Sequence, residues 1–301
     1  MTLNPDPVAD TRRAVADPWE KRRRQRATIG ETRTVEDEIE EILQGGIANA
    51  GAVVRIGDEV RRPGSRSTAT VHSLLQHVRS NGCDVVPEPL GVDPAGRDRL
   101  RFVPGRVAIP PFPAWSLTDE WLASTASAIR SFHDATVDFV APSDARWSNE
   151  LVDPTGSTEV ICHNDVCPEN VVTRNGVAVA LLDFDFAAPG RRVWDLAACA
   201  CMCVPMDAQE DAARLGRAGL DPVARVVLLA DSYGLVGLQR SELLQAIDER
   251  VAEGGQFVLR HVEAGEPAFI EMWQEMGGMA RYDRRREWFA QQFSGFEQAL
   301  A

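Results

Sequence analysis

The sequence predicts an α+β fold in two lobes, a small lobe built on an antiparallel sheet and a larger, mostly helical lobe. Two observations support this prediction. Short β-branched segments joined by turn residues dominate the first third of the chain, whereas segments with helical apolar spacing fill most of 117–301. A Pro-rich connector, PGRVAIPPFPAW, lies between them. We therefore expect a flexible basic tail over 1–33, an N-lobe over 34–105 and a C-lobe over 106–301.

The N-lobe begins with a predicted helix over 34–44, where apolar residues recur at helical spacing behind acidic residues. The segments AVVRIGD (52–58) and EVRRP (59–63) follow, joined by Gly57-Asp58, which is a strong hairpin signal. A helix is expected over 68–81, and two further strands around Gly96 within 85–105.

The C-lobe opens with a predicted helix over 117–136, capped by Thr118. Two short apolar runs at 159–165 and 177–186 enclose a loop with Pro168. Successive helices follow from about 194, with expected breaks near Pro205, Pro222, Gly254-Gly255 and Pro267.

Composition excludes several classes of function. The chain has 301 residues and a net charge of −13, and outside the tail it has no basic stretch of the kind that binds nucleic acid. No apolar run approaches the length of a membrane span, and residues 1–20 lack the apolar core of a signal peptide. We expect a cytoplasmic protein with no nucleic-acid or membrane partner. The oligomeric state is left open.

The six cysteines contain no CxxC pair. Three of them alternate in the apolar stretch AACACMCV, at 199, 201 and 203. Cysteine is often a small buried apolar residue, so packing is the favoured interpretation over metal or redox work.

The chemistry is concentrated in HNDVCPEN (163–170) and in DFD (183–185), which follows an aliphatic run. The pattern HxDxxxxN followed by a strand and DFD resembles the aminoglycoside phosphotransferase and choline kinase-like families, relatives of protein kinases. The match continues into GRRVWDLA (190–197). The resemblance implies a protein-kinase-like fold, ATP and Mg²⁺ as cofactors, and transfer of the γ-phosphate to a hydroxyl group.

The spacing suits phosphoryl transfer, which depends mainly on positioning and charge neutralisation. Asn170 offers a carbonyl oxygen and Asp183 a carboxylate, and both are hard ligands suited to Mg²⁺. Asp165 is placed to accept a proton from the acceptor hydroxyl. The family resemblance assigns the same roles to these three positions.

Three neighbouring residues are expected to support the site. His163 is interpreted as a structural residue that braces the loop, and Asp195 as a helix cap or a tie to the backbone of the catalytic loop. For Asp185, contact with a second Mg²⁺ and pairing with an arginine are equally favoured.

The N-lobe is expected to hold the nucleotide. GGIANAG (45–51) is a candidate phosphate-covering loop, with Gly46 and Asn49 as nucleotide contacts. Kinase relatives place a phosphate-binding lysine on the strand that corresponds here to EVRRP (59–63). This strand has no lysine, and Lys21 is the only lysine in the sequence. Because Val60 and Arg62 share a strand face, Arg62 is the natural substitute, with Val60 near adenine.

Two further features belong to this nucleotide site. The helix over 68–81 has no acidic residue, so His72 or Gln76 would have to replace the glutamate that usually pairs with the lysine. Phe102 and Val103, in the hinge segment LRFVPG (100–105), either line the adenine pocket or pack between the lobes.

The leading hypothesis is an ATP-dependent phosphotransferase acting on a hydroxylated small molecule, either an aminoglycoside-like antibiotic or an amino-alcohol or sugar metabolite. The acidic net charge favours a cationic acceptor. The alternative is a catalytically impaired, nucleotide-binding pseudoenzyme, suggested by the missing lysine. A protein kinase is a weaker third hypothesis, because AAPGRRVWDLA leaves no room for an activation segment.

Overall fold

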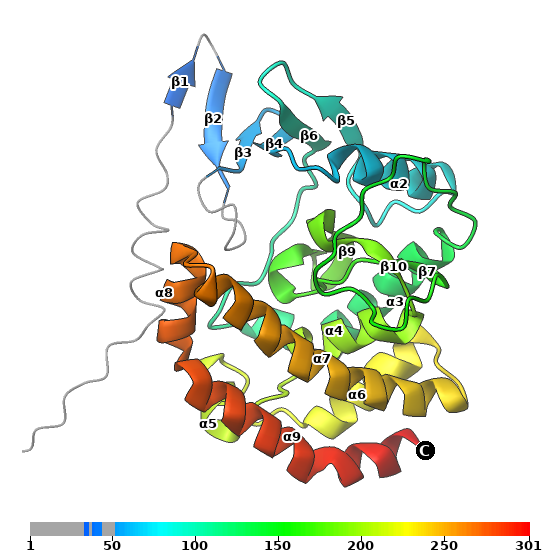
Figure 1. Ribbon diagram of the computed structural model, residues 1–301, viewed down its shortest axis with the longest axis vertical. Helices are drawn as coiled ribbons and strands as arrows, with labels where there is room; N and C mark the ends of the chain where they lie inside the picture. Colours follow the sequence, from blue (N-terminus) through cyan, green and yellow to red (C-terminus); the bar gives the residue numbers. More distant parts are fainter. Residues whose placement is uncertain (1–32, 36–37, 44–51) are drawn as a thin grey trace, which may run out of the picture.

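A six-stranded antiparallel sheet forms the small lobe of the protein. The computed structural model describes residues 33–35, 38–43 and 52–301 (Figure 1). In sheet order, the strands are β1 (Arg33–Val35), β2 (Glu38–Ile42), β3 (Val54–Ile56), β4 (Glu59–Pro63), β6 (Arg97–Arg101) and β5 (Pro89–Val92).

The turn between β3 and β4 confirms the hairpin predicted from Gly57-Asp58. Gly57 has a φ of 58°, a left-handed conformation that glycine adopts without a steric penalty. The hairpin pairs Val54 with Arg61 and Ile56 with Glu59. This register fixes which side chains of β4 point toward the rest of the molecule.

Helix α2 (Thr68–Ser80) connects the small lobe to the larger one. Its Leu74 and Leu75 are fully buried, in the same apolar core as Leu181 and Phe184 of the second lobe. The backbone N–H of Leu181 also donates to the carbonyl of Val85, 2.8 Å away, just beyond α2. The two lobes therefore share one continuous core.

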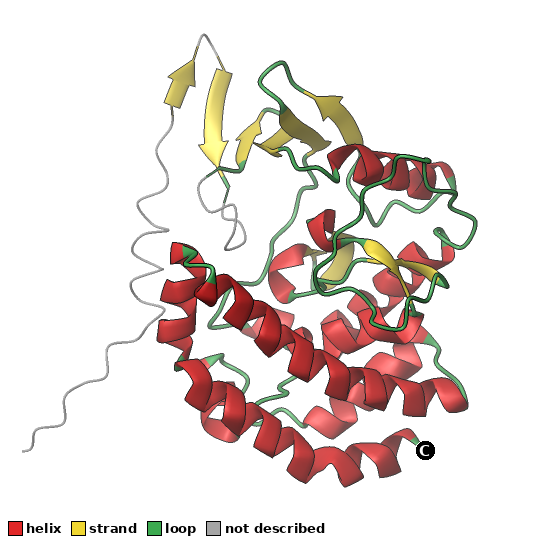
Figure 2. Cartoon of the chain, viewed as in Figure 1, coloured by secondary structure: helices red, strands yellow, loops and turns green. Residues whose placement is uncertain are grey.

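Two short strand pairs lie between the sheet and the helices of the larger lobe (Figure 2). They are formed by β7 (Val160–Cys162) with β10 (Ala188–Gly190), and by β8 (Val171–Arg174) with β9 (Val177–Leu181). The α-helices of the larger lobe are α3 (Asp119–Asp134), α4 (Arg192–Cys203), α5 (Gln209–Arg214), α6 (Pro222–Tyr233), α7 (Leu238–Glu263), α8 (Pro267–Met276) and α9 (Gly278–Leu300). Short 3₁₀ helices lie at Ala114–Ser116, Pro168–Asn170 and Phe184–Phe186. The predicted cap of α3 is confirmed, since Thr118 accepts a hydrogen bond from the backbone N–H of Trp121.

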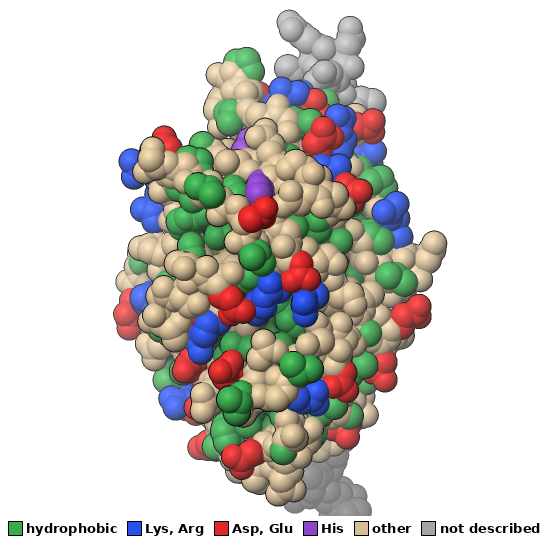
Figure 3. All heavy atoms as spheres, turned by 90° about the vertical axis from the view of Figure 1, so that its right-hand side faces the viewer, with side chains coloured by type: hydrophobic (Ala, Val, Ile, Leu, Met, Phe, Trp, Pro, Cys, Tyr) green, Lys and Arg blue, Asp and Glu red, His purple; other side chains and the backbone are tan. Residues whose placement is uncertain are grey.

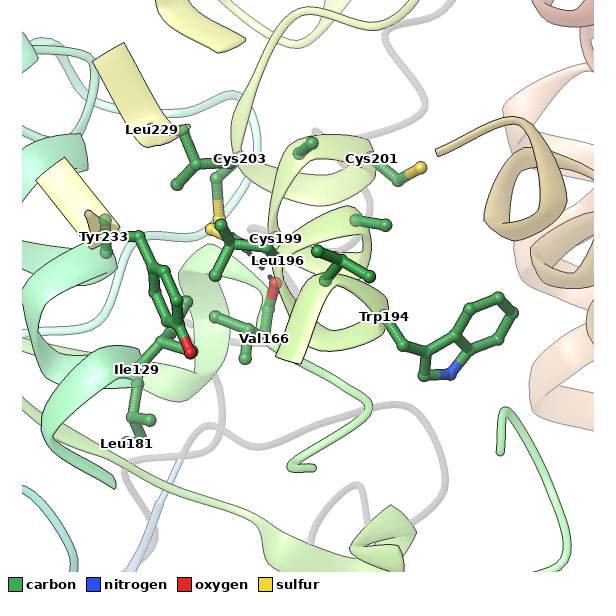
Figure 4. Packing of buried hydrophobic residues seen from close by; sticks show 14 of the residues in the cluster. Ile129, Val166, Leu181, Trp194, Leu196, Cys199, Cys201, Cys203, Leu229 and Tyr233 are labelled. Atoms are coloured by element: carbon green, nitrogen blue, oxygen red, sulfur yellow. Dashed lines mark hydrogen bonds between the residues drawn. The ribbon is translucent and has the colours of Figure 1, made fainter. Parts of the chain in front are cut away.

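Helix α4 is buried on several sides and contains three of the six cysteines. Figure 4 shows Cys199 and Cys203 directed toward Leu229 and Tyr233 of α6, and Cys201 directed to the other side of α4. All six cysteines are buried and free of disulfide bonds. Here they act as small apolar core residues.

The helix predicted over 34–44 is wrong, because β1 and β2 occupy this segment. Strand β2 pairs with β3, with Glu40 opposite Ile56 and Ile42 opposite Val54. The stretch is too short for its apolar spacing to separate a helical period from a strand period, and pairing with β3 decides the outcome. Residues 1–32 of the tail predicted over 1–33, and the whole loop GGIANAG (45–51) with Gly46 and Asn49, lie outside the described residues.

The predicted break at Gly254-Gly255 is also wrong, because α7 continues through both glycines. A Cβ atom on Gly255 would overlap the ring of Tyr282 from α9. Tyr282 donates its hydroxyl hydrogen to the carbonyl of Ala252, 3.1 Å away. Gly255 therefore allows close helix–helix packing.

In the part of the chain that the structure describes, no helix has both the length and the apolar character needed to cross a membrane. On the face shown in Figure 3, acidic and basic side chains lie interspersed.

Candidate active site

The loop after β7 carries Asp165, and its backbone is bound by the side chain of Asp195, in the first turn of α4. Asp195 is fully buried and accepts hydrogen bonds from the backbone N–H groups of His163 and Asn164, both at 2.7 Å. The ring of His133 donates to the same carboxylate at 3.0 Å. Burial alone would raise the pKa of Asp195, but the bond from His133 and the backbone donors hold it below its usual value. Asp195 therefore fixes the backbone of this loop.

His163 uses both ring nitrogens inside the loop. Its Nδ1 accepts from the backbone N–H of Asp165 at 3.2 Å, and its Nε2 donates to the carbonyl of Leu182 at 2.7 Å. The ring packs on Phe184, with centroids 4.5 Å apart. Burial lowers the pKa of His163, which favours the neutral ring that these two bonds require. This environment is that of a bracing residue.

Asp165 lies against Asn170, five residues later. The side-chain amide of Asn170 donates to Oδ2 of Asp165 at 2.9 Å and to its backbone carbonyl at 3.0 Å. Burial, followed by the negative charge of Asp183, raises the pKa of Asp165 to about 7. A carboxylate with this pKa accepts a proton more readily than an ordinary aspartate does.

Asp183 follows β9 and lies beside Asn170. It has a φ of 65°, which is unusual for a residue other than glycine. The backbone N–H of Leu182 donates to the carbonyl of Asn170 at 2.8 Å, so the two segments lie side by side. Because Asn170 gives its amide nitrogen to Asp165, its side-chain oxygen can face a cation. Asp183 can offer Oδ2, and two hard oxygens of this kind fit Mg²⁺.

Arg62 joins the two lobes at this point. Its guanidinium donates to Asp98 at 2.9 Å through Nε, to Asp183 at 2.7 Å through one terminal nitrogen and to Asp185 at 2.7 Å through the other. Only 9% of the Arg62 side chain is exposed. Burial would lower the pKa of Arg62, but the three carboxylates raise it above its usual value. Of the two interpretations of Asp185, the structure places it on an arginine.

The contact with Arg62 also affects Asp185. Burial raises the pKa of Asp185 to about 6 even though Arg62 opposes this effect, with the charge of Asp183 adding to the increase. Asp183 and Asp185 thus form an acidic pair at the junction of the lobes, with Arg62 as their shared cation.

Asp98 is a partner of Arg62 for which the sequence carries no local signal. It lies on β6 directly opposite Arg62 and accepts from His72 of α2 at 2.5 Å. An acidic partner for the strand cation therefore exists, but it comes from the sheet and not from the helix. The signal that could have revealed it is the register of β4 against β6, which places Asp98 opposite Arg62.

The remaining nucleotide candidates lie around this cluster. Val60 is half-buried on β4, opposite Leu100. Phe102 and Val103 follow β6 and are half-buried, and the guanidinium of Arg55 covers the Phe102 ring at 3.9 Å. The structure therefore brings together Asp165, Asn170, Asp183, Asp185 and Arg62, with His163 and Asp195 supporting the loop.

Comparison with known proteins connects this geometry to a family. Residues 144–228, which contain the whole loop and strand motif, match the family described as "Phosphotransferase enzyme family". The chain is also 34% identical over 192 residues to the trifolitoxin immunity protein of Rhizobium leguminosarum bv. trifolii. The matched region covers 62% of this chain and 72% of that protein. The chain belongs to the phosphotransferase enzyme family.

Solved structures confirm the two-lobed, protein-kinase-like fold. A choline/ethanolamine kinase family protein from Mesorhizobium loti superposes with a TM-score of 0.60 at 18% identity, over 93% of this chain and 98% of that one. A GDP complex of a mutant aminoglycoside 2′-phosphotransferase-IIIa gives 0.56 at 16% identity, over 92% and 98%. A macrolide 2′-phosphotransferase from Brachybacterium faecium gives 0.50 at 16% identity, over 82% and 94%.

Proposed function

We propose that this phosphotransferase moves the γ-phosphate of ATP, with Mg²⁺, to a hydroxyl group of a small molecule. The observation that carries the proposal is the meeting of Asp165, Asn170 and Asp183 on one side of the lobe junction with Arg62 on the other. Phosphoryl transfer needs these elements, namely a base, oxygen ligands for a metal and a cation for the phosphates.

Asp165 is the proposed base. It accepts the proton of the acceptor hydroxyl while Asn170, bonded to its Oδ2, keeps the carboxylate aimed. Asn170 and Asp183 are the residues that would hold Mg²⁺, which neutralises charge on the phosphates when it is bound. Arg62 offers its guanidinium fork to the phosphate oxygens. The presence of all these groups argues against a pseudoenzyme.

The proposed acceptor is a hydroxylated small molecule that carries positive charge. The net charge of −13 favours a cationic guest, and the names of the structural neighbours include choline/ethanolamine and aminoglycoside phosphotransferases. A second candidate role, protection against a toxin, is favoured by the similarity to the trifolitoxin immunity protein. The two roles are compatible if the toxin is the molecule that becomes phosphorylated.

The metal site provides the test of this function. ATP should raise the melting temperature of the wild-type protein more strongly with Mg²⁺ than without it. Asn170→Ala and Asp183→Ala should each abolish the Mg²⁺-dependent part, and the double variant should lose little more, because the two residues act as a unit. Independent, additive losses, or stabilisation by ATP that is the same without Mg²⁺, would contradict the proposal.

A further inference from the structure

Arg62 contacts three carboxylates, and one of them lies on its own sheet while the other two lie on the opposite lobe. Asp98 lies directly opposite on the neighbouring strand and accepts from Nε at 2.9 Å. Asp183 and Asp185 accept from the two terminal nitrogens, and both belong to the other lobe. Because a guanidinium is planar, fixing Nε within the sheet also fixes the direction in which the two terminal nitrogens point.

Asp98 is itself locked in place. Its side chain is 1% exposed, and its two oxygens are divided between Arg62, on Oδ2, and His72, on Oδ1 at 2.5 Å. A buried carboxylate is tolerated when both of its oxygens are satisfied in this way. The chain of contacts from His72 through Asp98 to Arg62 links helix α2 to the cation at the lobe junction.

The contacts of Asp183 and Asp185 must change when the site is used. If Asp183 binds a metal and the terminal nitrogens of Arg62 turn to phosphate oxygens, the partners of those nitrogens are exchanged. The bond from Nε to Asp98 needs no exchange, because it lies on the sheet side of the guanidinium.

We propose that Asp98, held by His72, is the positioning residue for Arg62 and keeps its guanidinium aimed at the nucleotide phosphates. This inference rests on the proposed function. Helix α2 has no acidic side chain that could pair with the strand cation. In this proposal Asp98 of β6, together with His72 of α2, orients Arg62 instead.

A double-mutant cycle tests whether Asp98 acts through Arg62. The affinity of a non-hydrolysable ATP analogue with Mg²⁺ is measured by calorimetry for the wild type, Asp98→Asn, Arg62→Ala and the double variant. Asp98→Asn should weaken binding about 10-fold when Arg62 is present and less than about 2-fold in the Arg62→Ala background. An equal weakening in both backgrounds, or none in either, overturns the inference.

A control variant separates positioning from general stability. Asp93 lies in the same sheet region, is 6% exposed and forms an ion pair with Arg97 at 2.7 Å. Asp93→Asn should lower the melting temperature and leave nucleotide affinity unchanged. A loss of affinity in this control equal to that of Asp98→Asn would show that both act through stability, and would overturn the inference.

His72 provides a second route if Asp98→Asn does not fold. His72→Leu removes the donor to Asp98 and should weaken nucleotide binding about 3-fold or more, whereas His72→Gln keeps a donor and should restore most of the affinity. Equal affinities for these two variants would count against the inference. Failure of the wild-type protein to bind the nucleotide would contradict the proposed function itself, so the two failures are distinguishable.

Discussion

Arginine at position 62 performs a task that a lysine could not perform in this setting. A guanidinium has donors along three edges, and here they contact three carboxylates on two lobes. A lysine ammonium is a compact charge, so it would not reach the carboxylate on the sheet and those on the opposite lobe at the same time. The arginine that stands in place of the usual lysine is therefore matched by a carboxylate on the neighbouring strand, Asp98 of β6.

The two neighbouring arginines of β4 give a matched prediction. Arg62→Ala should weaken ATP binding or lower turnover about 10- to 150-fold, since loss of a charge-assisted contact costs about 1.5–3 kcal/mol. Arg61 is on the other strand face, 3.6 Å from Glu59, and Arg61→Ala should have little effect. Arg62→Lys should show a partial loss. Nucleotide titration of the three variants decides, and equal affinities would contradict a phosphate-binding role.

The sequence placed the residues of the candidate catalytic loop near one another, but it did not indicate their partner on the sheet. Asp165 is five residues from Asn170, and the β8–β9 hairpin, which pairs Val171 with Leu181, returns the chain so that Asp183 lies beside Asn170. Asp98 is 36 residues from Arg62 and meets it only through the register of β4 against β6. Register depends on the whole sheet, which is why this partner could not be derived from local pattern.

At the scale of elements, the long helix α7 depends on a glycine that faces another helix. Gly255 is buried where Tyr282 of α9 packs against it, whereas Gly254 beside it has open space at the position of a Cβ atom. Composition alone cannot separate these neighbours, and a glycine pair in a sequence favours a helix break. The packing partner, far away in the chain, decides that the helix continues.

These adjacent glycines should respond to alanine with opposite signs. Gly255→Ala forces a Cβ atom into the Tyr282 ring and should lower the free energy of unfolding by about 1–3 kcal/mol. Gly254→Ala should raise it by about 0.5–1 kcal/mol, because alanine loses less backbone freedom in a helix. Chemical denaturation of both variants is the measurement. A stabilising Gly255→Ala would disprove the close contact of α7 with α9.

The first strands show the same limit of local pattern. Residues 38–42 read EIEEI, where acidic and apolar residues suit either a short helix or a strand. The strand wins because β3 supplies hydrogen-bond partners along this segment. The hairpin at Gly57-Asp58 was predictable because its turn chemistry is local.

At the scale of the whole molecule, charge gives a prediction about the acceptor. Acidic side chains attract a cation over a Debye length of about 8–10 Å at moderate salt. The Michaelis constant for the true acceptor should therefore rise as the salt concentration rises, while turnover at saturation changes little. The check is a series of kinetic assays at increasing salt. A neutral or anionic acceptor without salt dependence would contradict a cationic substrate.

The most direct test of the account is phosphate transfer by Asp165→Asn. Asparagine preserves the shape of the side chain but cannot accept the proton of the acceptor hydroxyl. The substitution should therefore lower the rate of phosphate transfer without weakening nucleotide binding. With an acceptor identified by an ATP-consumption screen over hydroxylated compounds, we expect transfer to fall at least about 100-fold while the affinity for Mg²⁺ and ATP stays near that of the wild type. Turnover by Asp165→Asn at the wild-type rate would contradict the assignment of Asp165 as the base.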